Sequence, residues 1–164
     1  MMRASQVLTV LSVLAALVGL SWWAVAATCA GSLPPSNALA GWVTVPNSTL
    51  SGAMGGEASY RAYDGAVEAM KAQGIRSFAQ RVYRHSTSGR YLTLDVYQLR
   101  DVAAAQALYA KKQKGYNQAK PLTNDSSIKD AAFIGTLGGM TFGVLRCGSF
   151  VAEANIAKAA TPQD

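Results

Sequence analysis

The sequence predicts an α+β domain: an antiparallel sheet of about five to six strands with two helices on one face, preceded by an N-terminal apolar helix. Three observations lead to this prediction. Two segments repeat apolar residues at helical spacing, and the segments between and after them alternate apolar and polar residues. The first 30 residues are almost wholly apolar. The expected order of elements in the domain is β-α-β-β-α-β-β-β.

The apolar start of the chain predicts export across a bacterial inner membrane. Residues 7–27 carry no charge, Arg3 precedes them, and small residues and Cys29 follow. Three fates fit this pattern: cleavage as a signal peptide, retention as a single-pass anchor, and lipidation of Cys29. The free and anchored forms both place the remainder of the chain in the periplasm.

Composition then divides the chain into four parts. The formal net charge is +6, with 50% hydrophobic and 15% charged residues, and the part beyond the apolar start has the size of one domain. Basic charge is compatible with anionic lipids or acidic partners, but export disfavours nucleic acid as a partner. The expected layout is an export signal or anchor (1–30), a Pro/Ser/Gly linker (31–41), a single α+β domain (42–156) and a disordered tail (157–164).

The first half of the domain begins with a short strand over residues 42–45 and a loop over 46–56 that is rich in breakers. Apolar residues at three- and four-residue steps then predict one helix over 57–73, stopped by a glycine. A glycine inside a helix costs about 1 kcal/mol relative to alanine. Gly65 therefore indicates close packing of this helix, and the alternative is that Asp64 faces a cleft.

A hairpin is expected next, with strands over residues 75–85 and 90–99 and a four-residue turn. In the second strand Leu92, Leu94 and Val96 form a core face, and the other face carries aromatic residues. Asp101 is a suitable N-cap for an alanine-rich helix that ends at Gly115. A polar loop over 116–130 precedes two or three further strands, over residues 131–135, 139–147 and 149–156.

The middle of the chain resembles an uncharacterised family of bacterial exported domains over residues 39–155. That family shows Gly-Trp, Tyr-x-x-x-Asp-Gly-Ala, a glycine at the helix end, Val-Tyr-x-Leu and an Asp-x-x-x-Ala helix start. The matching residues are Gly41, Trp42, Tyr60, Asp64, Gly65, Ala66, Gly74, Tyr83, Asp95, Val96, Tyr97, Gln98, Leu99, Asp101 and Ala105. The resemblance implies an exported α+β fold and supplies no reaction. The family usually carries a longer C-terminal helix, which this sequence lacks.

The sequence offers few residues for chemistry. The two cysteines, Cys29 and Cys147, form one disulfide in an oxidising compartment, or Cys147 is a buried apolar residue. Two cysteines and one histidine without CxxC or HxxxH spacing indicate no metal site, and no cofactor motif is present. His85 is the only histidine, and without a GxSxG motif it is better explained as a turn residue than as a general base.

These observations predict a protein that is not an enzyme. The leading hypothesis is an exported accessory or interaction subunit at the periplasmic face of the inner membrane, within a larger membrane or envelope complex, with membrane contact through residues 7–27. The alternative is a periplasmic binding module for a small or lipidic ligand. A candidate interaction surface, which alternatively closes the core, consists of Trp42, Tyr83, Arg84, Tyr91 and Tyr97.

Overall fold

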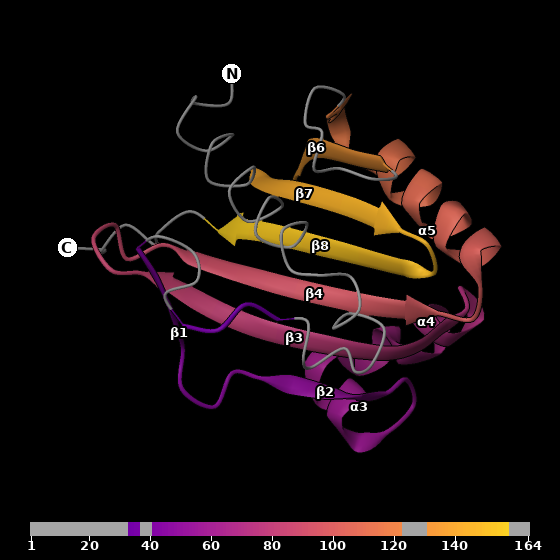
Figure 1. Ribbon diagram of the computed structural model, residues 1–164, viewed down its shortest axis with the longest axis horizontal. Coiled ribbons are helices and arrows are strands. Elements are labelled where there is room, and N and C mark those ends of the chain that lie inside the picture. Colours follow the sequence, from indigo (N-terminus) through magenta and orange to yellow (C-terminus); the bar gives the residue numbers. More distant parts are fainter. Residues whose placement is uncertain (1–32, 37–40, 123–130, 158–164) are drawn as a thin grey trace.

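A computed structural model describes residues 33–36, 41–122 and 131–157. Eight strands form one antiparallel sheet in the order β1-β3-β4-β8-β7-β6-β5, with β2 pairing β3 beside this path (Figure 1). The predicted α+β class is confirmed, whereas the number of strands is higher than predicted. The strands are β1 (Trp42–Thr44), β2 (Leu50–Ala53), β3 (Ile75–His85), β4 (Tyr91–Leu99), β5 (Asn117–Pro121), β6 (Ala131–Leu137), β7 (Met140–Cys147) and β8 (Phe150–Ala157).

The two additional strands lie in segments that were expected to be loops. The strand β2 falls within residues 46–56 and β5 within residues 116–130. Both are edge strands, mostly exposed, and neither alternates apolar with polar residues. Their backbone groups pair with β3 and β6, so hydrogen bonding to a neighbour places them in the sheet without an apolar pattern.

The predicted helix over residues 57–73 is interrupted. It consists of α3 (Glu57–Tyr63), a 3₁₀ turn η2 (Asp64–Ala66) and α4 (Val67–Ala72). Asp64 adopts φ 45° and ψ −126°, a conformation that non-glycine residues rarely occupy. The expected close packing at Gly65 is wrong, because this residue is exposed and an added Cβ would meet nothing within 4 Å.

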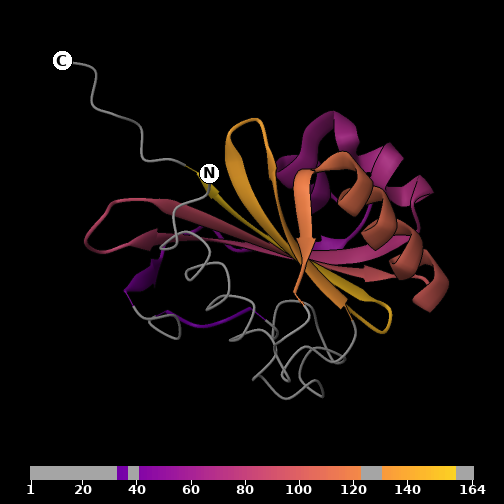
Figure 2. The ribbon, with the colours of Figure 1, turned by 90° about the horizontal axis from the view of Figure 1, so that it is seen from above.

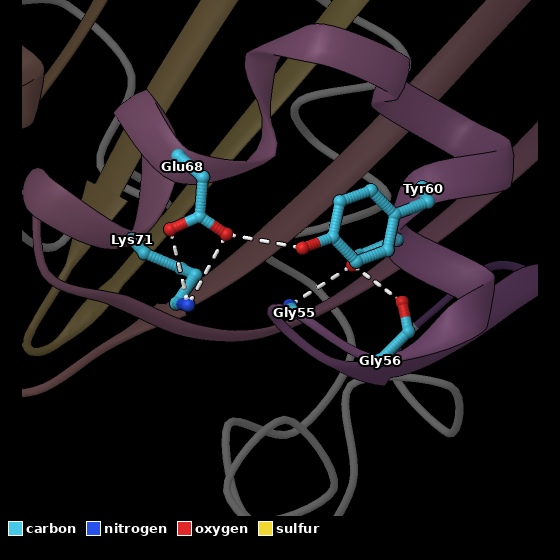
Figure 3. A network of polar contacts seen from close by, with 6 residues as sticks. Gly55, Gly56, Tyr60, Glu68 and Lys71 are labelled. Atoms are coloured by element: carbon cyan, nitrogen blue, oxygen red, sulfur yellow. Dashed lines mark hydrogen bonds and ion pairs between the residues drawn. The ribbon is translucent and has the colours of Figure 1, made fainter.

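Polar contacts tie the two helical pieces together across the interruption (Figure 3). The Tyr60 hydroxyl donates to Glu68 Oε1 at 3.0 Å, and Lys71 Nζ lies 3.2 Å from both oxygens of that carboxylate. At the start of α3, Gly55 N–H donates to Ser59 Oγ at 2.9 Å. The contacts of Glu68 are exposed, so we expect them to contribute little to stability.

The second predicted helix is confirmed as α5 (Val102–Gly115). The Asp101 carboxylate accepts a hydrogen bond from the Ala104 N–H at 2.7 Å, as expected of an N-cap. Ala104, Ala105 and Leu108 are buried against the sheet. All described helices lie on the same side of the sheet (Figure 2).

The sheet therefore separates two apolar cores. On the helix-covered face, Phe78, Phe133 and Val151 pack with the helices. On the helix-free face the core consists of Leu33, Trp42, Ala79, Tyr83, Leu92, Leu94, Val96, Ala132, Ile134, Leu145, Ala152, Ala154 and Ile156. The predicted core face of the second hairpin strand, β4, is thus confirmed, and it is the helix-free face.

Part of the expected linker belongs to this second core. Leu33 is only 4% exposed, Pro34 is fully buried, and both lie against the sheet. This part of the segment therefore packs on the domain and is not a free spacer. The predicted N-terminal apolar helix and most of the predicted tail lie outside the described residues.

Candidate functional site

A row of polar side chains crosses the helix-covered face of the sheet. Gln80 on β3 is the register partner of Asp95 on β4, which is in turn the register partner of Glu153 on β8. Residues that are partners in register share a face and lie side by side. Alternation along β4 places Asp95 opposite to Leu94 and Val96 and directs it towards the helices. Two carboxylates are therefore neighbours beneath the helical layer.

Asp95 is 5% exposed and is held by neutral donors. Its Oδ1 accepts a hydrogen bond from the Tyr63 hydroxyl at 2.7 Å and from Gln80 Nε2 at 2.8 Å. Burial raises the pKa of Asp95 to about 6; the two hydrogen bonds oppose this rise and the charge of Glu153 adds to it. Burial thus favours the neutral form of the Asp95 carboxyl more than water does.

Glu153 has a charged partner in the last turn of α5 and a neutral partner directly after that helix. Lys112 Nζ forms an ion pair with Glu153 Oε2, and the Tyr116 hydroxyl donates to Glu153 Oε1. The Lys112 ammonium also lies 5.7 Å from the centre of the Tyr97 ring, in cation–π geometry. We call Tyr63, Gln80, Asp95, Lys112, Tyr116 and Glu153 the carboxylate network.

Three tyrosines surround the network as neutral groups. Burial is the first cause that raises the pKa of Tyr63, Tyr97 and Tyr116 well above that of a free phenol, and nearby carboxylates raise it further. The hydroxyls of Tyr63 and Tyr116 therefore remain protonated donors. The network joins both helical segments to the centre of the sheet.

Sequence reasoning missed the network as a unit. Asp95 and Glu153 are each the one charged residue of their strand, at a position that faces the helices, which is the signal that was available. Their proximity depends on β8 pairing with β4 across about 50 residues of intervening chain, which spacing does not reveal. Gly135 also contributes, because a Cβ there would lie 2.8 Å from the Tyr116 Cβ.

The predicted interaction surface is largely inside the protein. Trp42, Tyr83 and Tyr97 are at most 5% exposed and close the two cores, so they are not part of an exposed surface. Arg84 is exposed, Tyr91 is 46% exposed, and the two are register partners near the end of the β3–β4 hairpin. Of the five residues of the predicted surface, Arg84 and Tyr91 are therefore the two that a partner could contact.

His85 is the last residue of β3 and borders the turn that follows it. Its Nδ1 accepts hydrogen bonds from the N–H groups of Thr87 at 3.3 Å and Ser88 at 3.2 Å. Its ring packs edge-on against Trp42 with 5.1 Å between ring centres. These contacts assign His85 a role in shaping the turn.

A second group of polar contacts lies on the helix-free side, at the start of the described chain. The Pro34 carbonyl accepts hydrogen bonds from the Tyr83 hydroxyl at 2.7 Å and from Arg81 Nη1 at 2.8 Å. Burial raises the pKa of Tyr83 to about 12, which keeps its hydroxyl a donor. We call Pro34, Arg81 and Tyr83 the Pro34 clamp.

The remaining predictions concern cysteines, metals and the membrane. Cys147 is half-buried at the end of β7, whereas Cys29 lies outside the described residues, so their disulfide stays a prediction. Within residues 33–36, 41–122 and 131–157, no group of three or more His, Cys, Asp or Glu side chains is placed to hold a metal. Within the same ranges, no helix has the length and hydropathy needed to span a bilayer.

Comparison with known proteins adds little to this description. No family model matches the chain, and no curated protein sequence matches it. Among solved structures, the extracellular domain of PknH from Mycobacterium tuberculosis is similar over 71% of this chain and 72% of that chain. The sequence identity is 9% and the TM-score is 0.31, values too low to establish a shared fold or function.

Proposed function

We propose that this chain is an exported, non-catalytic domain at the periplasmic face of the inner membrane, where it acts as an accessory or interaction subunit of a larger complex. The export segment in residues 1–30 supports the location. The observation that carries the proposal is the Pro34 clamp, because it joins the start of the domain to the sheet seven residues after the apolar segment ends at Ala27. A retained segment then holds the folded domain directly at the membrane.

A binding role is favoured over catalysis because the buried ionisable groups are bonded to one another. In the carboxylate network, Asp95 accepts from Tyr63 and Gln80, and Glu153 pairs with Lys112 and Tyr116. The His85 ring is engaged in its own turn. Among the described residues, these groups contact one another and serve packing, and no nucleophile–base pair of the serine-hydrolase type is assembled around them.

The experiment is purification of the tagged full chain from native membranes in mild detergent. We expect a defined protein partner to elute with it at constant stoichiometry. The exposed pair tests the contact surface: Arg84→Ser with Tyr91→Ser should reduce the amount of partner recovered. The matched control is Lys111→Ser with Tyr60→Ser, which removes an exposed cation and an exposed tyrosine elsewhere. Elution of the unaltered chain as a monomer without partner would refute the proposal.

The alternative, a binding module for a small or lipidic ligand, is favoured by one feature. On the helix-free face a continuous set of aliphatic side chains forms a buried apolar core that a lipidic ligand would have to enter; it includes Leu92, Leu94, Val96, Leu145 and Ile156. A ligand that binds only the folded state raises the unfolding temperature, and the rise grows with the logarithm of ligand concentration above its Kd. Thermal unfolding of the purified chain with a lipid and metabolite library therefore separates the two functions.

A further inference from the structure

The helices and the first described residues of the chain pack on opposite sides of the sheet. The described helices α3, α4 and α5 all pack on one side (Figure 2). Leu33 and Pro34, which follow the apolar segment, lie on the other side, where Leu33 joins the core that contains Trp42 and Leu92. The chain therefore enters the domain on its helix-free side.

This entry point is held by several independent contacts. Besides the bonds from Arg81 and Tyr83 to the Pro34 carbonyl, Arg81 Nη1 lies 3.4 Å from the Leu33 carbonyl oxygen. The Ser36 hydroxyl accepts a hydrogen bond from Thr44 N–H at 3.2 Å. Arg81 also donates through Nε to Thr49 Oγ1 at 2.8 Å, which fixes its guanidinium plane. A buried carbonyl with two charged or phenolic donors is costly to release.

The length of chain between the apolar segment and the clamp limits how far the domain can move. Six Cα steps separate Ala27 from Leu33, and a fully extended chain covers at most about 20 Å over that distance. A domain of this size has a radius of gyration of about 13 Å and hence a diameter of about 34 Å. The connection is therefore shorter than the domain is wide, and the helical side cannot easily turn towards the bilayer.

We propose that the helix-free side of the sheet faces the phospholipid surface, that the helices are turned away from it, and that the Pro34 clamp sets this orientation. The inference rests on the proposed function in one respect, since residues 7–27 must remain in the membrane. It assigns the lipid surface to one side of the domain and leaves the helical side, with the carboxylate network beneath it, to a protein partner.

The test is depth-dependent quenching in liposomes. The full chain is synthesised in a cell-free system without signal peptidase, in the presence of phosphatidylglycerol and phosphatidylethanolamine vesicles that carry headgroup nitroxides. A fluorophore is attached through a noncanonical amino acid at Ser51 or at Gln106. Both residues are exposed; Ser51 is the register partner of Ala79 on the helix-free face, and Gln106 lies on the outer side of α5. We expect the headgroup nitroxides to quench the fluorophore at Ser51 and to leave the fluorophore at Gln106 unquenched.

Two variants test the cause of the orientation. Arg81→Gln with Tyr83→Phe releases the Pro34 carbonyl and should remove the difference between the two reporters while circular dichroism still shows a folded domain. If that variant does not fold, a spacer of about ten Gly/Ser residues placed after Ala30 lengthens the connection by about 17 Å without touching the clamp. It should equalise the two reporters as well.

The outcomes separate this inference from the proposed function. Equal quenching at both positions in the unaltered chain, or stronger quenching at Gln106, overturns the orientation. A persistent difference after lengthening overturns the role of the connection. Failure to recover a partner from native membranes, with quenching at Ser51 retained, would end the accessory-subunit proposal and leave the orientation intact.

Discussion

The two faces of the sheet differ in the kind of side chain that they bury. The helix-covered face contains two buried carboxylates, and α3, α5 and the residue after α5 supply the ammonium and two phenols that contact them. The helix-free face buries mainly aliphatic side chains, and its polar contacts include those of the Pro34 clamp. Among the described residues, the two buried carboxylates lie where a second layer provides partners, because an unpaired buried charge is strongly destabilising.

Removal of the cation from the carboxylate network should have the largest effect. Lys112→Met leaves Glu153 buried beside Asp95 without its counter-charge, and we expect a loss of about 4 kcal/mol in the free energy of unfolding. Urea unfolding measures this. Adding Glu153→Gln to Lys112→Met should restore most of the stability, and no recovery in the double variant would contradict the assignment of the loss to unpaired charge.

A cavity on the helix-free face should cost somewhat less. Leu94 is fully buried, and Leu94→Ala should lower the free energy of unfolding by about 3 kcal/mol through lost contacts and incomplete collapse. Leu137 is 44% exposed, so Leu137→Ala is the matched control and should change little. Equal effects at the two positions would show that the helix-free face is not a packed core.

The pH dependence of stability distinguishes the two faces directly. An aspartate in an unfolded chain has a pKa near 3.9, whereas that of Asp95 in the folded protein is about 6. Between these values the folded state binds more protons, so the contribution of Asp95 to stability falls as pH rises through this window. We expect that contribution to be lower at pH 7 than at pH 4 by on the order of 2 kcal/mol.

The variant Asp95→Asn isolates this contribution. It removes the titrating group but keeps an oxygen that accepts from Tyr63 and Gln80. Urea unfolding at pH 4 and pH 7 should show a smaller decline with rising pH in Asp95→Asn than in the unaltered protein. If the free energy of unfolding fell equally in the two proteins between pH 4 and pH 7, Asp95 would not be the source of the pH dependence.

The smallest loss of stability is expected from a substitution at Gly135, the strand residue against which Tyr116 packs. In Gly135→Ala the new Cβ would lie 2.8 Å from the Tyr116 Cβ, so the ring must move away from Glu153, at a cost of about 1–2 kcal/mol. Gly115→Ala is the control, because a Cβ there meets nothing within 4 Å. Thermal unfolding should show a lower midpoint for the first variant only; a similar midpoint for both would mean that Tyr116 adapts without loss.

Individual residues show why prediction succeeded in some places and not in others. The hairpin of β3 and β4, the Asp101 cap and the alternation of Leu92, Leu94 and Val96 follow from local rules and are confirmed. The interruption at Asp64 was missed because its apolar spacing continues through a backbone conformation that side-chain periodicity does not record. For Trp42, Tyr83 and Tyr97 the alternative holds, since they close the cores; the sequence left both interpretations open because the residue types that favour interfaces also fill cores.

By itself, the sequence determined the fold class, the two main helical regions, the central hairpin and the expectation of export, because propensity, periodicity and apolar length act locally along the chain. Only the tertiary structure decided that β2 and β5 join the sheet, that Pro34 is bound by Arg81 and Tyr83, and that Asp95, Glu153 and Lys112 meet. The physical reason is that these contacts join residues far apart in the chain. Strand order and register bring them together, and neither is encoded in any single segment.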